Sequence, residues 1–386
     1  MLMKKITQKV DVKKKVLPHT QAKLDLFKGY LEHYLRVLGH ADFCKQINLF
    51  DIYCGAGIYD DGKKGSPLLT IDCIRNVSTE LINSGKTPKP IRLSVNDYDA
   101  QKIENVKSNV NINNVENCAI EYHNKDANEM LDIVANLVSI YPKEHRNLVF
   151  IDPYGYSNIN KDKIIGLLNN KCTEIVMFLP VMQMYRFSEI AFIDKEKPHY
   201  ENLRKFIISF FKYASNIKTK TIFEYIHSIK DALSINETYF TCSHYIEREK
   251  GSYYALFFIS SNIYGLEKML ETKWKLDPVK GKGYNQNKNP MQMSMFDKEM
   301  NDTDNLREIS HLENVIYQKI KQKGAITNIE IYELTLRNEF LPKHANRALK
   351  NLVEQKKIKE IINSSGYGIN HSNYKNKIVT TKFETL

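Results

Sequence analysis

The sequence predicts an α/β protein with a Rossmann-like, mainly parallel sheet and a C-terminal winged-helix-like domain. Between positions 47 and 180, short apolar runs alternate with helical patterns of about ten or more residues, which is typical of βαβ units. Residues 305–369 show three amphipathic helical patterns, followed by a run with strand character. Three helices and a β-wing suggest a winged helix-turn-helix.

Composition bounds the class of protein. The chain has 386 residues, enough for two domains, and its 42% hydrophobic and 26% charged residues are ordinary for a soluble globular protein. No apolar run approaches the ~20 residues of a membrane span. The Lys-rich N-terminus also lacks the apolar stretch of a signal peptide. We therefore expect a cytoplasmic protein with no membrane partner.

The net charge and the cysteine spacing bear on which partners and metal ions the protein could bind. A formal net charge of +11 fits a nucleic acid partner, because each cation that neutralises a phosphate releases a counterion. A generally Lys-rich composition would give the same charge, so both explanations stay open. The six cysteines form no Cys-x-x-Cys pair, which argues against a zinc or iron–sulfur site. We expect no bound metal.

The expected elements follow from the spacing of apolar residues. A helix at 20–40 precedes the first strand, because apolar residues recur there at three- and four-residue intervals. Five parallel strands are expected at 47–53, 91–96, 119–123, 148–152 and 174–180. Helices are expected at 66–84, 99–111, 127–140 and 161–169. Alternating runs at 239–246 and 253–260 predict an antiparallel hairpin that closes the sheet.

The domain organisation follows from composition as well as from pattern. Residues 277–304 are rich in Lys, Asn, Gln and Gly and poor in core formers, which indicates a linker. The expected segments are a flexible basic arm at 1–18, a cofactor-binding α/β domain at 19–276, the linker, a winged-helix-like domain at 305–372 and a tail at 373–386.

The first candidate site is the glycine loop Asp51-Ile-Tyr-Cys-Gly-Ala-Gly, which directly follows the first strand. Glycine is needed where a strand turns into a helix around a ligand, because a Cβ atom would block the approach of the backbone. The loop has fewer glycines than a site that wraps a pyrophosphate, which favours S-adenosylmethionine. We predict cofactor contacts for Asp51, Tyr53, Gly55 and Gly57. The alternative is a plain tight turn.

Two further acidic residues follow later strands. Asp97 closes the second strand, where a Rossmann-type sheet places the carboxylate that accepts hydrogen bonds from the ribose hydroxyls. Asp99 is its neighbour, and we expect it to cap the following helix. Asp126 follows the third strand, where it would contact the adenine amine or cap the next helix. We leave both roles of Asp126 open.

The tetrapeptide from Asp152 to Gly155 (Asp-Pro-Tyr-Gly) ends the fourth strand, on the edge where parallel sheets bind ligands. An acidic residue followed by proline and an aromatic residue is the arrangement used to methylate exocyclic amines of nucleobases. Asp152 and the carbonyl of Pro153 would accept hydrogen bonds from the amine, and Tyr154 would stack on the base. These contacts would align the nitrogen with the methyl group. The alternative is a proline turn after a buried strand.

Three residues are secondary candidates for substrate contacts. Ser66 and Pro67 suit the N-cap and first position of a helix, and this helix begins close to the predicted pocket. Gly155 closes the tetrapeptide. Arg186 follows the fifth strand and would meet a phosphate or carboxylate, or else lie on a solvated helix start.

Together these motifs resemble the three-Cys-motif partner (TcmP) family, a bacterial group with a methyltransferase-like fold. The resemblance covers residues 19–23, 30–31, 51–57, 65–68, 96–97, 152–155, 186 and 274–281, and the winged-helix-like region. The family has Phe where this chain has Tyr53 and Tyr154. The resemblance implies a Rossmann-type methyltransferase fold and a partner protein that carries three cysteines. The tetrapeptide is also similar to the Asp-Pro-Phe-Gly of tRNA guanine dimethyltransferases.

From these motifs we expect an S-adenosylmethionine-dependent methyltransferase that acts on an exocyclic amine of a DNA or RNA base. The C-terminal domain would bind the nucleic acid backbone. The alternative is a non-catalytic or nucleotide-sensing component of an interaction or phage-defence system, which would work with a three-cysteine protein.

Overall fold

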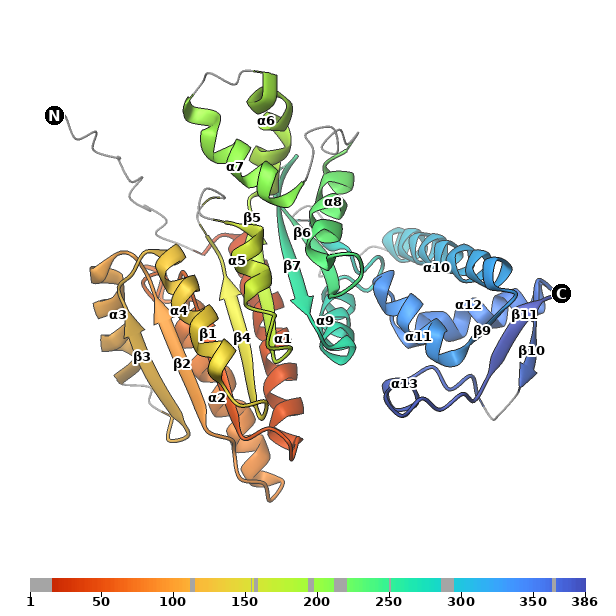
Figure 1. Cartoon of the computed structure of the whole chain (residues 1–386), viewed down its shortest axis with the longest axis horizontal. Coiled ribbons are helices and arrows are strands. Elements are labelled where there is room, and N and C mark those ends of the chain that lie inside the picture. Colours follow the sequence, from red (N-terminus) through yellow and green to blue (C-terminus); the bar gives the residue numbers. More distant parts are fainter. Residues whose placement is uncertain are drawn as a thin grey trace.

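The computed structural model describes residues 16–111, 115–153, 155, 159–193, 198–211, 221–249, 251–285, 295–362 and 366–386. An eight-stranded sheet organises the α/β part, and a three-stranded sheet with helices forms the C-terminal part (Figure 1). This confirms the predicted fold class. Most of the expected N-terminal arm lies outside the described residues.

The main sheet has the strand order β3-β2-β1-β4-β5-β7-β6-β8. The first five strands are parallel, and β7 is antiparallel to both β5 and β6. Because the order reverses between β1 and β4, ligands are expected beyond the carboxyl ends of these two strands. The bounds are β1 Gln46–Asp51, β2 Ile91–Asn96, β3 Cys118–His123, β4 His145–Ile151, β5 Thr173–Leu179, β6 Phe240–Glu249, β7 Ser252–Ser260 and β8 Gly283–Asn285.

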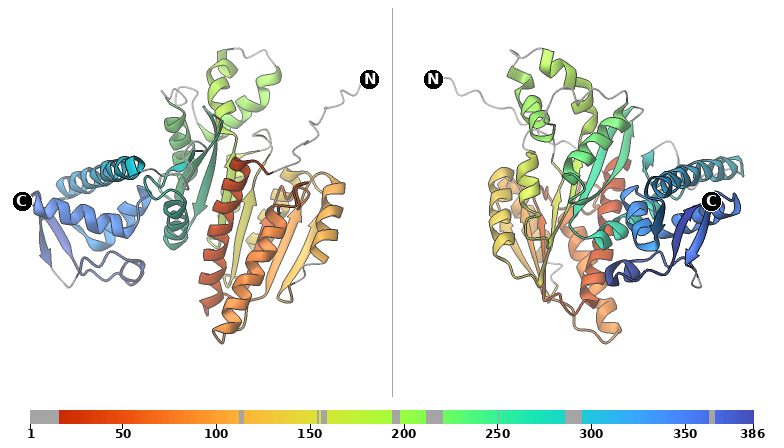
Figure 2. Two further views of the ribbon diagram at one scale, coloured as in Figure 1. Left: turned by 180° about the vertical axis from the view of Figure 1, so that it is seen from behind. Right: turned by 45° about the vertical axis from the view of Figure 1, so that its right-hand side comes forward.

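Helices cover both faces of this sheet, because alternate residues of its central strands are apolar on both sides. In β4, Leu148 and Phe150 face one core, whereas Val149 and Ile151 face the other. Figure 2 shows both helical layers. The first layer contains α1 Pro18–His40, α2 Ser66–Asn83, α3 Ala100–Asn111 and α9 Ile263–Leu276. The second contains α4 Ala127–Ile140, α5 Lys161–Gly166, α6 Val181–Ile193, α7 Glu201–Phe210 and α8 Ile222–Ser234. A 3-10 turn, Pro198–Tyr200, precedes α7.

The C-terminal part has the element order of a winged helix. Its elements are α10 Met295–Lys323, β9 Ala325–Thr327, α11 Asn328–Arg337, α12 Pro342–Glu354, β10 Ile358–Ile362, α13 His371–Asn376 and β11 Lys382–Thr385. Two sequence expectations need correction. The first helix begins at Met295 rather than at position 305, and the expected tail supplies β11, the middle strand of the sheet. The short β11 places one apolar side chain, Phe383, in the core.

The C-terminal part packs against α8, α9 and β6 of the main domain. Glu339 lies between the ammonium groups of Lys273 and Lys230, with its carboxylate 2.9 Å from that of Lys230. The indole N–H of Trp274 donates to the backbone carbonyl of Glu339 over 2.9 Å. Trp274 also contacts the His344 ring. Among the described residues, no helix is long and apolar enough to cross a membrane.

Candidate cofactor site

Three carboxylates gather at the edge where β1, β2 and β4 end. Asp51 is the last residue of β1 and lies opposite Val95 of β2 and Phe150 of β4. Asp97 and Asp152 follow those neighbouring strands within two residues. The register of the three strands therefore brings the three carboxylates to one edge. Within the described part of the chain, no group of three or more His, Cys, Asp or Glu side chains is placed to hold a metal ion.

Asp51 is buried, and its carboxylate is incompletely paired. The hydroxyl of Ser66 donates to Oδ2 over 2.6 Å, whereas Oδ1 is buried with no hydrogen-bond partner of good geometry among the described residues. Burial raises the pKa of Asp51 to about 7, and the charges of Asp152 and Asp97 add to the rise. Hydrogen bonds from Ser66 and the backbone of Tyr53 act in the opposite direction. A buried oxygen without a partner costs about 1–3 kcal/mol, so this carboxyl suits a ligand that donates a hydrogen bond.

The turn after β1 requires glycine at two positions. Gly55 has φ +63° and Gly57 has φ +80°, a region that side chains with a Cβ atom disfavour. A Cβ atom on Gly57 would lie 3.1 Å from the Val106 side chain of α3. One on Gly55 would meet nothing within 4 Å. The turn is therefore shaped by glycine and leaves open space beside Gly55.

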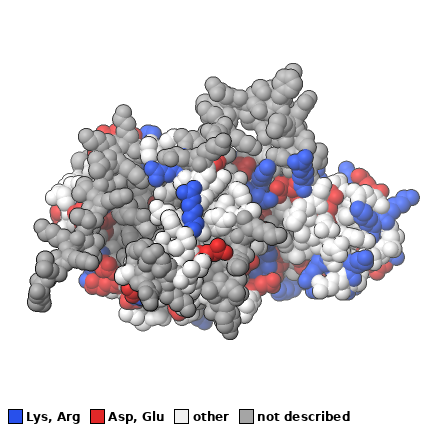
Figure 3. Space-filling view, turned by 90° about the horizontal axis from the view of Figure 1, so that it is seen from above, with Lys and Arg blue, Asp and Glu red and all other residues white. Residues whose placement is uncertain are grey.

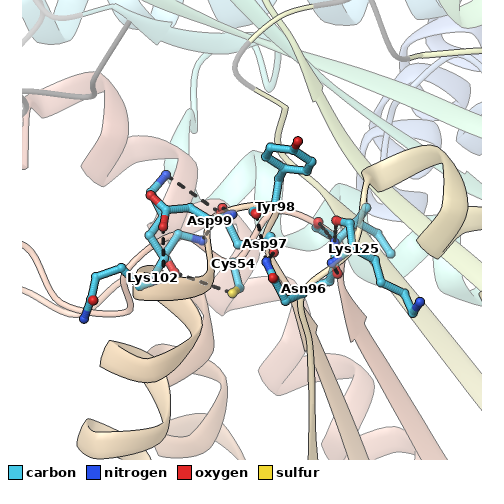
Figure 4. Close-up of polar contacts among 11 residues, drawn as sticks. Cys54, Asn96, Asp97, Tyr98, Asp99, Lys102 and Lys125 are labelled. Carbon is cyan, nitrogen blue, oxygen red and sulfur yellow. Dashed lines mark hydrogen bonds and ion pairs between the residues drawn. The ribbon is translucent and has the colours of Figure 1, made fainter. Parts of the chain in front are cut away.

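Asp97 ties this turn to β2. Its Oδ2 accepts from the backbone N–H of Gly55 over 3.1 Å, and its Oδ1 accepts from the N–H of Asp99 over 3.0 Å (Figure 4). The Lys102 ammonium lies 3.9 Å from Oδ2, and the N–H of Cys54 donates to the Asn96 carbonyl. Asp97 is thus a support of the loop. Each carboxylate oxygen has a further lone pair for another donor.

Two other acidic residues cap helices. Asp99 accepts from the N–H of Gln101 over 2.9 Å, which confirms its expected role as a cap. Asp126 is the N-cap of α4 and accepts from the N–H of Asn128 over 2.9 Å. Its contact with adenine stays a prediction. The hydroxyl of Tyr53 is buried without a partner in the described part of the chain, and burial, together with the charges of Asp126 and Asp97, raises its pKa.

Asp152 has a partner that sequence reasoning missed. The ammonium of Lys23, on α1, lies 2.7 Å from Asp152 Oδ1. It also sits 4.8 Å from the ring centre of Tyr254 and 5.2 Å from that of Phe178. The Lys23 and Asp152 side chains are 13% and 27% exposed, so the pair is partly shielded from water. The one sequence signal for Lys23 was its place in the 19–23 segment of the family resemblance.

The remaining candidates for substrate contacts differ in their exposure to solvent, and one of them lies outside the described residues. Pro153 is buried and Gly155 half-buried, whereas Tyr154 lies outside the described residues. Ser66 was wrongly predicted as an N-cap: α2 begins at Ser66 with Gly65 as its N-cap, because the Ser66 hydroxyl bonds to Asp51 instead. Arg186 is exposed on α6, which follows β5.

Tyr98 is a second residue that sequence reasoning missed. Its side chain is 66% exposed directly after Asp97, and Figure 4 shows the ring pointing away from the Asp97 hydrogen bonds. An aromatic residue that immediately follows a strand-ending acid was the available signal. A large exposed ring beside a ligand edge offers a stacking surface for a planar group.

These residues fit S-adenosylmethionine. The cofactor carries a sulfonium and an ammonium group, and the edge presents three carboxylates against the two nearby lysines, Lys23 and Lys102. The Oδ1 of Asp51, which has no hydrogen bond of good geometry among the described residues, can accept from the cofactor ammonium. The open space beside Gly55 lets the ligand approach the backbone.

A comparison with models of known protein families finds a match in the C-terminal part of the chain. Residues 283–365 match the family model of the GMT-like wHTH domain. A search of curated proteins by sequence finds no match.

Several solved structures show a loose likeness to the chain. A SAM-dependent methyltransferase from Agrobacterium tumefaciens is 11% identical, with 62% of each chain covered and a TM-score of 0.35. An O-methyltransferase from Bacillus cereus in complex with SAH is 14% identical, with 64% of this chain and 83% of that chain covered and a TM-score of 0.32. A putative O-methyltransferase from Klebsiella pneumoniae is 14% identical, with 63% and 90% covered and a TM-score of 0.32. Likenesses this loose leave the strand order of the chain itself as the evidence for its fold.

Proposed function

We propose that this protein is an S-adenosylmethionine-dependent methyltransferase that acts on an exocyclic amine of a nucleic acid base. One observation carries the proposal: a glycine turn and three strand-ending carboxylates share one edge of the sheet, and a buried oxygen of Asp51 there has no hydrogen bond of good geometry from any described residue. The order of the first five strands places this edge at the point where such sheets bind ligands.

In this proposal the residues after β1, β2 and β3 hold the cofactor. Asp51 accepts from its ammonium group, and the backbone at Gly55 and Gly57 lies against it. Asp97 accepts from the ribose hydroxyls while it keeps the loop in place. Around the adenine, Tyr98 stacks, Asp126 meets the amine and Tyr53 closes the pocket. The bound cofactor supplies an electrophilic methyl group.

The residues after β4 position the substrate amine. Asp152 and the carbonyl of Pro153 accept its hydrogens, and Tyr154 stacks on the base. Lys23 holds one oxygen of Asp152 over 2.7 Å and so fixes the orientation of the carboxylate. The other oxygen is left for the amine. Ser66, Gly155 and Arg186 are further substrate contacts in this proposal. A base in a duplex must be flipped out to reach this edge.

The C-terminal domain supplies the surface for the nucleic acid backbone. On α12, the third helix of the winged helix, Lys343, Arg347 and Lys350 recur on the exposed face. In winged and plain helix-turn-helix proteins the corresponding helix enters the major groove. Figure 3 shows Lys and Arg side chains on the described surface of the C-terminal part, at the right of the view. Phosphate contacts from these cations would position the substrate without reading its sequence.

The proposal is tested by transfer of labelled methyl groups from S-adenosylmethionine to single-stranded and duplex RNA and DNA. Wild type should label a base amine. Asp152→Ala should lower the transfer rate about 100-fold, because the amine loses its alignment, and should still bind the cofactor through Asp51 and Asp97. Asp132→Asn, on the outer face of α4, is the matched control and should keep full activity. Absence of transfer to every nucleic acid, or full activity of Asp152→Ala, contradicts the proposal.

The Lys23–Asp152 ion pair favours a second candidate function. A carboxylate that is already paired with a lysine over 2.7 Å can have a purely structural role in a non-catalytic protein. Such a protein would bind the cofactor or a nucleotide as a component of a defence system. The resemblance to the TcmP family implies that its partner would then be a protein that carries three cysteines. Cofactor binding without transfer to any nucleic acid, together with stable association with that partner, would support this candidate over the enzyme.

A further inference from the structure

A cavity of about 630 Å³ lies at the edge of the main sheet opposite to the candidate cofactor site. It is lined where β4 and β5 begin and where β7 ends, and by α1, α9 and α13. The parallel strands point upward in Figure 1, so this edge is at the lower end of the sheet. None of the described residues assigned to the cofactor or substrate lines the cavity. Its volume is within the ~300–1,000 Å³ typical of small-molecule sites.

The inner end of the cavity contains a buried carboxyl group. Glu174 accepts hydrogen bonds from the hydroxyls of Tyr30 and Ser260, the latter over 2.8 Å. Burial raises the pKa of Glu174, and these hydrogen bonds lower it in part. Glu174 makes no ion pair within the described part of the chain, so the inner end is polar without a strong fixed charge.

Two hydroxyl groups at this end have no hydrogen-bond partner among the described residues. Tyr34 and Ser261 line the cavity, and the hydroxyl oxygen of each is buried and makes no hydrogen bond to any described residue. The Tyr34 side chain is more than nine-tenths buried, at 7% exposed. Such groups cost about 1–3 kcal/mol when they stay unpaired. They indicate a ligand whose polar edge reaches this depth.

The mouth of the cavity is cationic. Lys171 and Lys375 are exposed there and form no ion pair within the described residues. Arg146 lines the same side with its guanidinium 4.7 Å from the ring centre of Phe43. Lys268 also lines the cavity, paired with Glu271 over 2.7 Å. Lys171, Lys375 and Arg146, none of which forms an ion pair within the described residues, outnumber the buried carboxyl group of Glu174 and make a potential that attracts an anion.

Aromatic side chains form much of the wall between the mouth and the inner end. They are Tyr30, Tyr34, Phe43, Phe240, Tyr264 and Tyr374. Rings of this kind bind planar heteroaromatic groups by stacking and edge contacts. The ligand should therefore be planar and polar at one end and anionic at the other.

We propose that this cavity binds a nucleoside monophosphate, with the base against Tyr34, Ser261 and Glu174 and the phosphate at the cationic mouth. Because α13 contributes His371, Tyr374 and Lys375, the ligand contacts both the main sheet domain and the C-terminal part. This helix lies beyond the residues that match the winged-helix family model. The site is independent of the proposed methyl transfer.

The test is isothermal titration of the full chain with AMP, GMP and UMP, each with and without saturating S-adenosylmethionine. At least one nucleotide should bind one to one, and the cofactor should not displace it. Adenosine, guanosine and uridine, which lack the phosphate, should bind at least tenfold more weakly than their monophosphates. The double variant Lys171→Glu/Lys375→Glu should abolish nucleotide binding. Lys86→Glu, an exposed lysine outside the cavity, should leave it unchanged.

The variant Tyr34→Phe tests whether the Tyr34 hydroxyl binds a ligand or only stabilises the fold. It removes one buried hydroxyl that has no partner among the described residues, and little packing volume, so thermal stability should stay equal or rise. Nucleotide affinity should fall about tenfold, the effect of losing one hydrogen bond. The proposal is overturned if no monophosphate binds, if S-adenosylmethionine displaces the bound nucleotide, or if binding survives both the double charge reversal and Tyr34→Phe.

Discussion

Asp51 holds its proton more tightly in the folded chain than in the unfolded chain. Its pKa rises from 3.8 to about 7, mainly because the carboxyl group is buried. The neutral form therefore stabilises the folded state fully below the unfolded pKa, and this stabilisation is lost as the pH rises from about 4 through about 7. At higher pH the fold contains a buried negative charge, one oxygen of which has no hydrogen bond of good geometry among the described residues.

Asp51→Asn should remove this pH dependence. Asparagine keeps an oxygen for the Ser66 hydroxyl and does not titrate. The melting temperature of the variant relative to wild type should be higher at about pH 8 than at about pH 5. Affinity for S-adenosylmethionine should fall at both values. Asp132→Asn serves as a control with an exposed carboxylate. If the melting temperatures of variant and wild type differ by the same amount at both pH values, the account of Asp51 is contradicted.

The sequence predicts the position of a site residue when that residue stands at the end of a strand in a parallel sheet. Asp51, Asp97 and Asp152 each stand at the end of an expected strand or next to it, so a parallel sheet must bring them to one edge. Lys23 could not be assigned in this way, because it lies 129 positions from Asp152 and reaches it from a helix. The same limit applies to Glu174 and Tyr34, whose meeting depends on how α1 packs.

At the scale of elements, the glycine turn between β1 and α2 makes two different demands. Gly55→Ala should cost about 1 kcal/mol of unfolding free energy, because the positive φ is strained but the space is open. Gly57→Ala adds the close contact with Val106 and should cost about 2–3 kcal/mol. Chemical denaturation measures both. Equal costs, or a larger cost at Gly55, would contradict the geometry of the turn.

Helix α12 should govern the electrostatic part of nucleic acid binding. Arg347 is exposed on the face that also presents Lys343 and Lys350. If Arg347 neutralises one phosphate, Arg347→Ala should reduce the slope of log affinity against log salt concentration by about 0.7–0.9. Lys321→Ala, an exposed change on α10, is the control. A slope identical to that of wild type would exclude Arg347 from the interface.

The elements themselves were largely predictable. The expected strands at 91–96 and 253–260 agree with β2 and β7 to within one residue, because apolar alternation in the first and a dense apolar run in the second leave little freedom. Weakly patterned pieces were missed. The strand β8 has three residues, and β11 has one buried apolar side chain, so each depends on a sheet neighbour that the sequence does not reveal.

At the scale of the whole molecule, Glu339 connects the C-terminal part to the main domain. Burial alone would raise its pKa, but Lys273 and Lys230 outweigh this effect and hold it at about 2, below the ordinary value of 4.5. The resulting stabilisation is present above about pH 4.5 and is lost as the pH falls through about 2. The winged helix is therefore fixed relative to the sheet near neutral pH.

Glu339→Gln should destabilise the protein by about 3 kcal/mol, because Lys273 is fully buried and would lose its counter-charge. Melting curves at neutral pH should shift downward and broaden as the two parts uncouple. The gap between wild type and variant should narrow below about pH 4. Glu354→Gln, on an exposed ion pair of α12, should change little. An unaltered melting curve for Glu339→Gln would contradict this role of the ion pair.

The most direct measurement of the central claim is isothermal titration of the folded protein with S-adenosylmethionine. Wild type should bind one cofactor per chain. Gly55→Leu should abolish binding, because its side chain fills the open space beside the glycine turn. Gly85→Leu is the matched control, since Gly85 also has a positive φ and open space but lies at the turn after α2; it should bind as wild type does. Absence of binding by the wild type, or equal binding by Gly55→Leu, would contradict the claim that this edge of the sheet holds the cofactor.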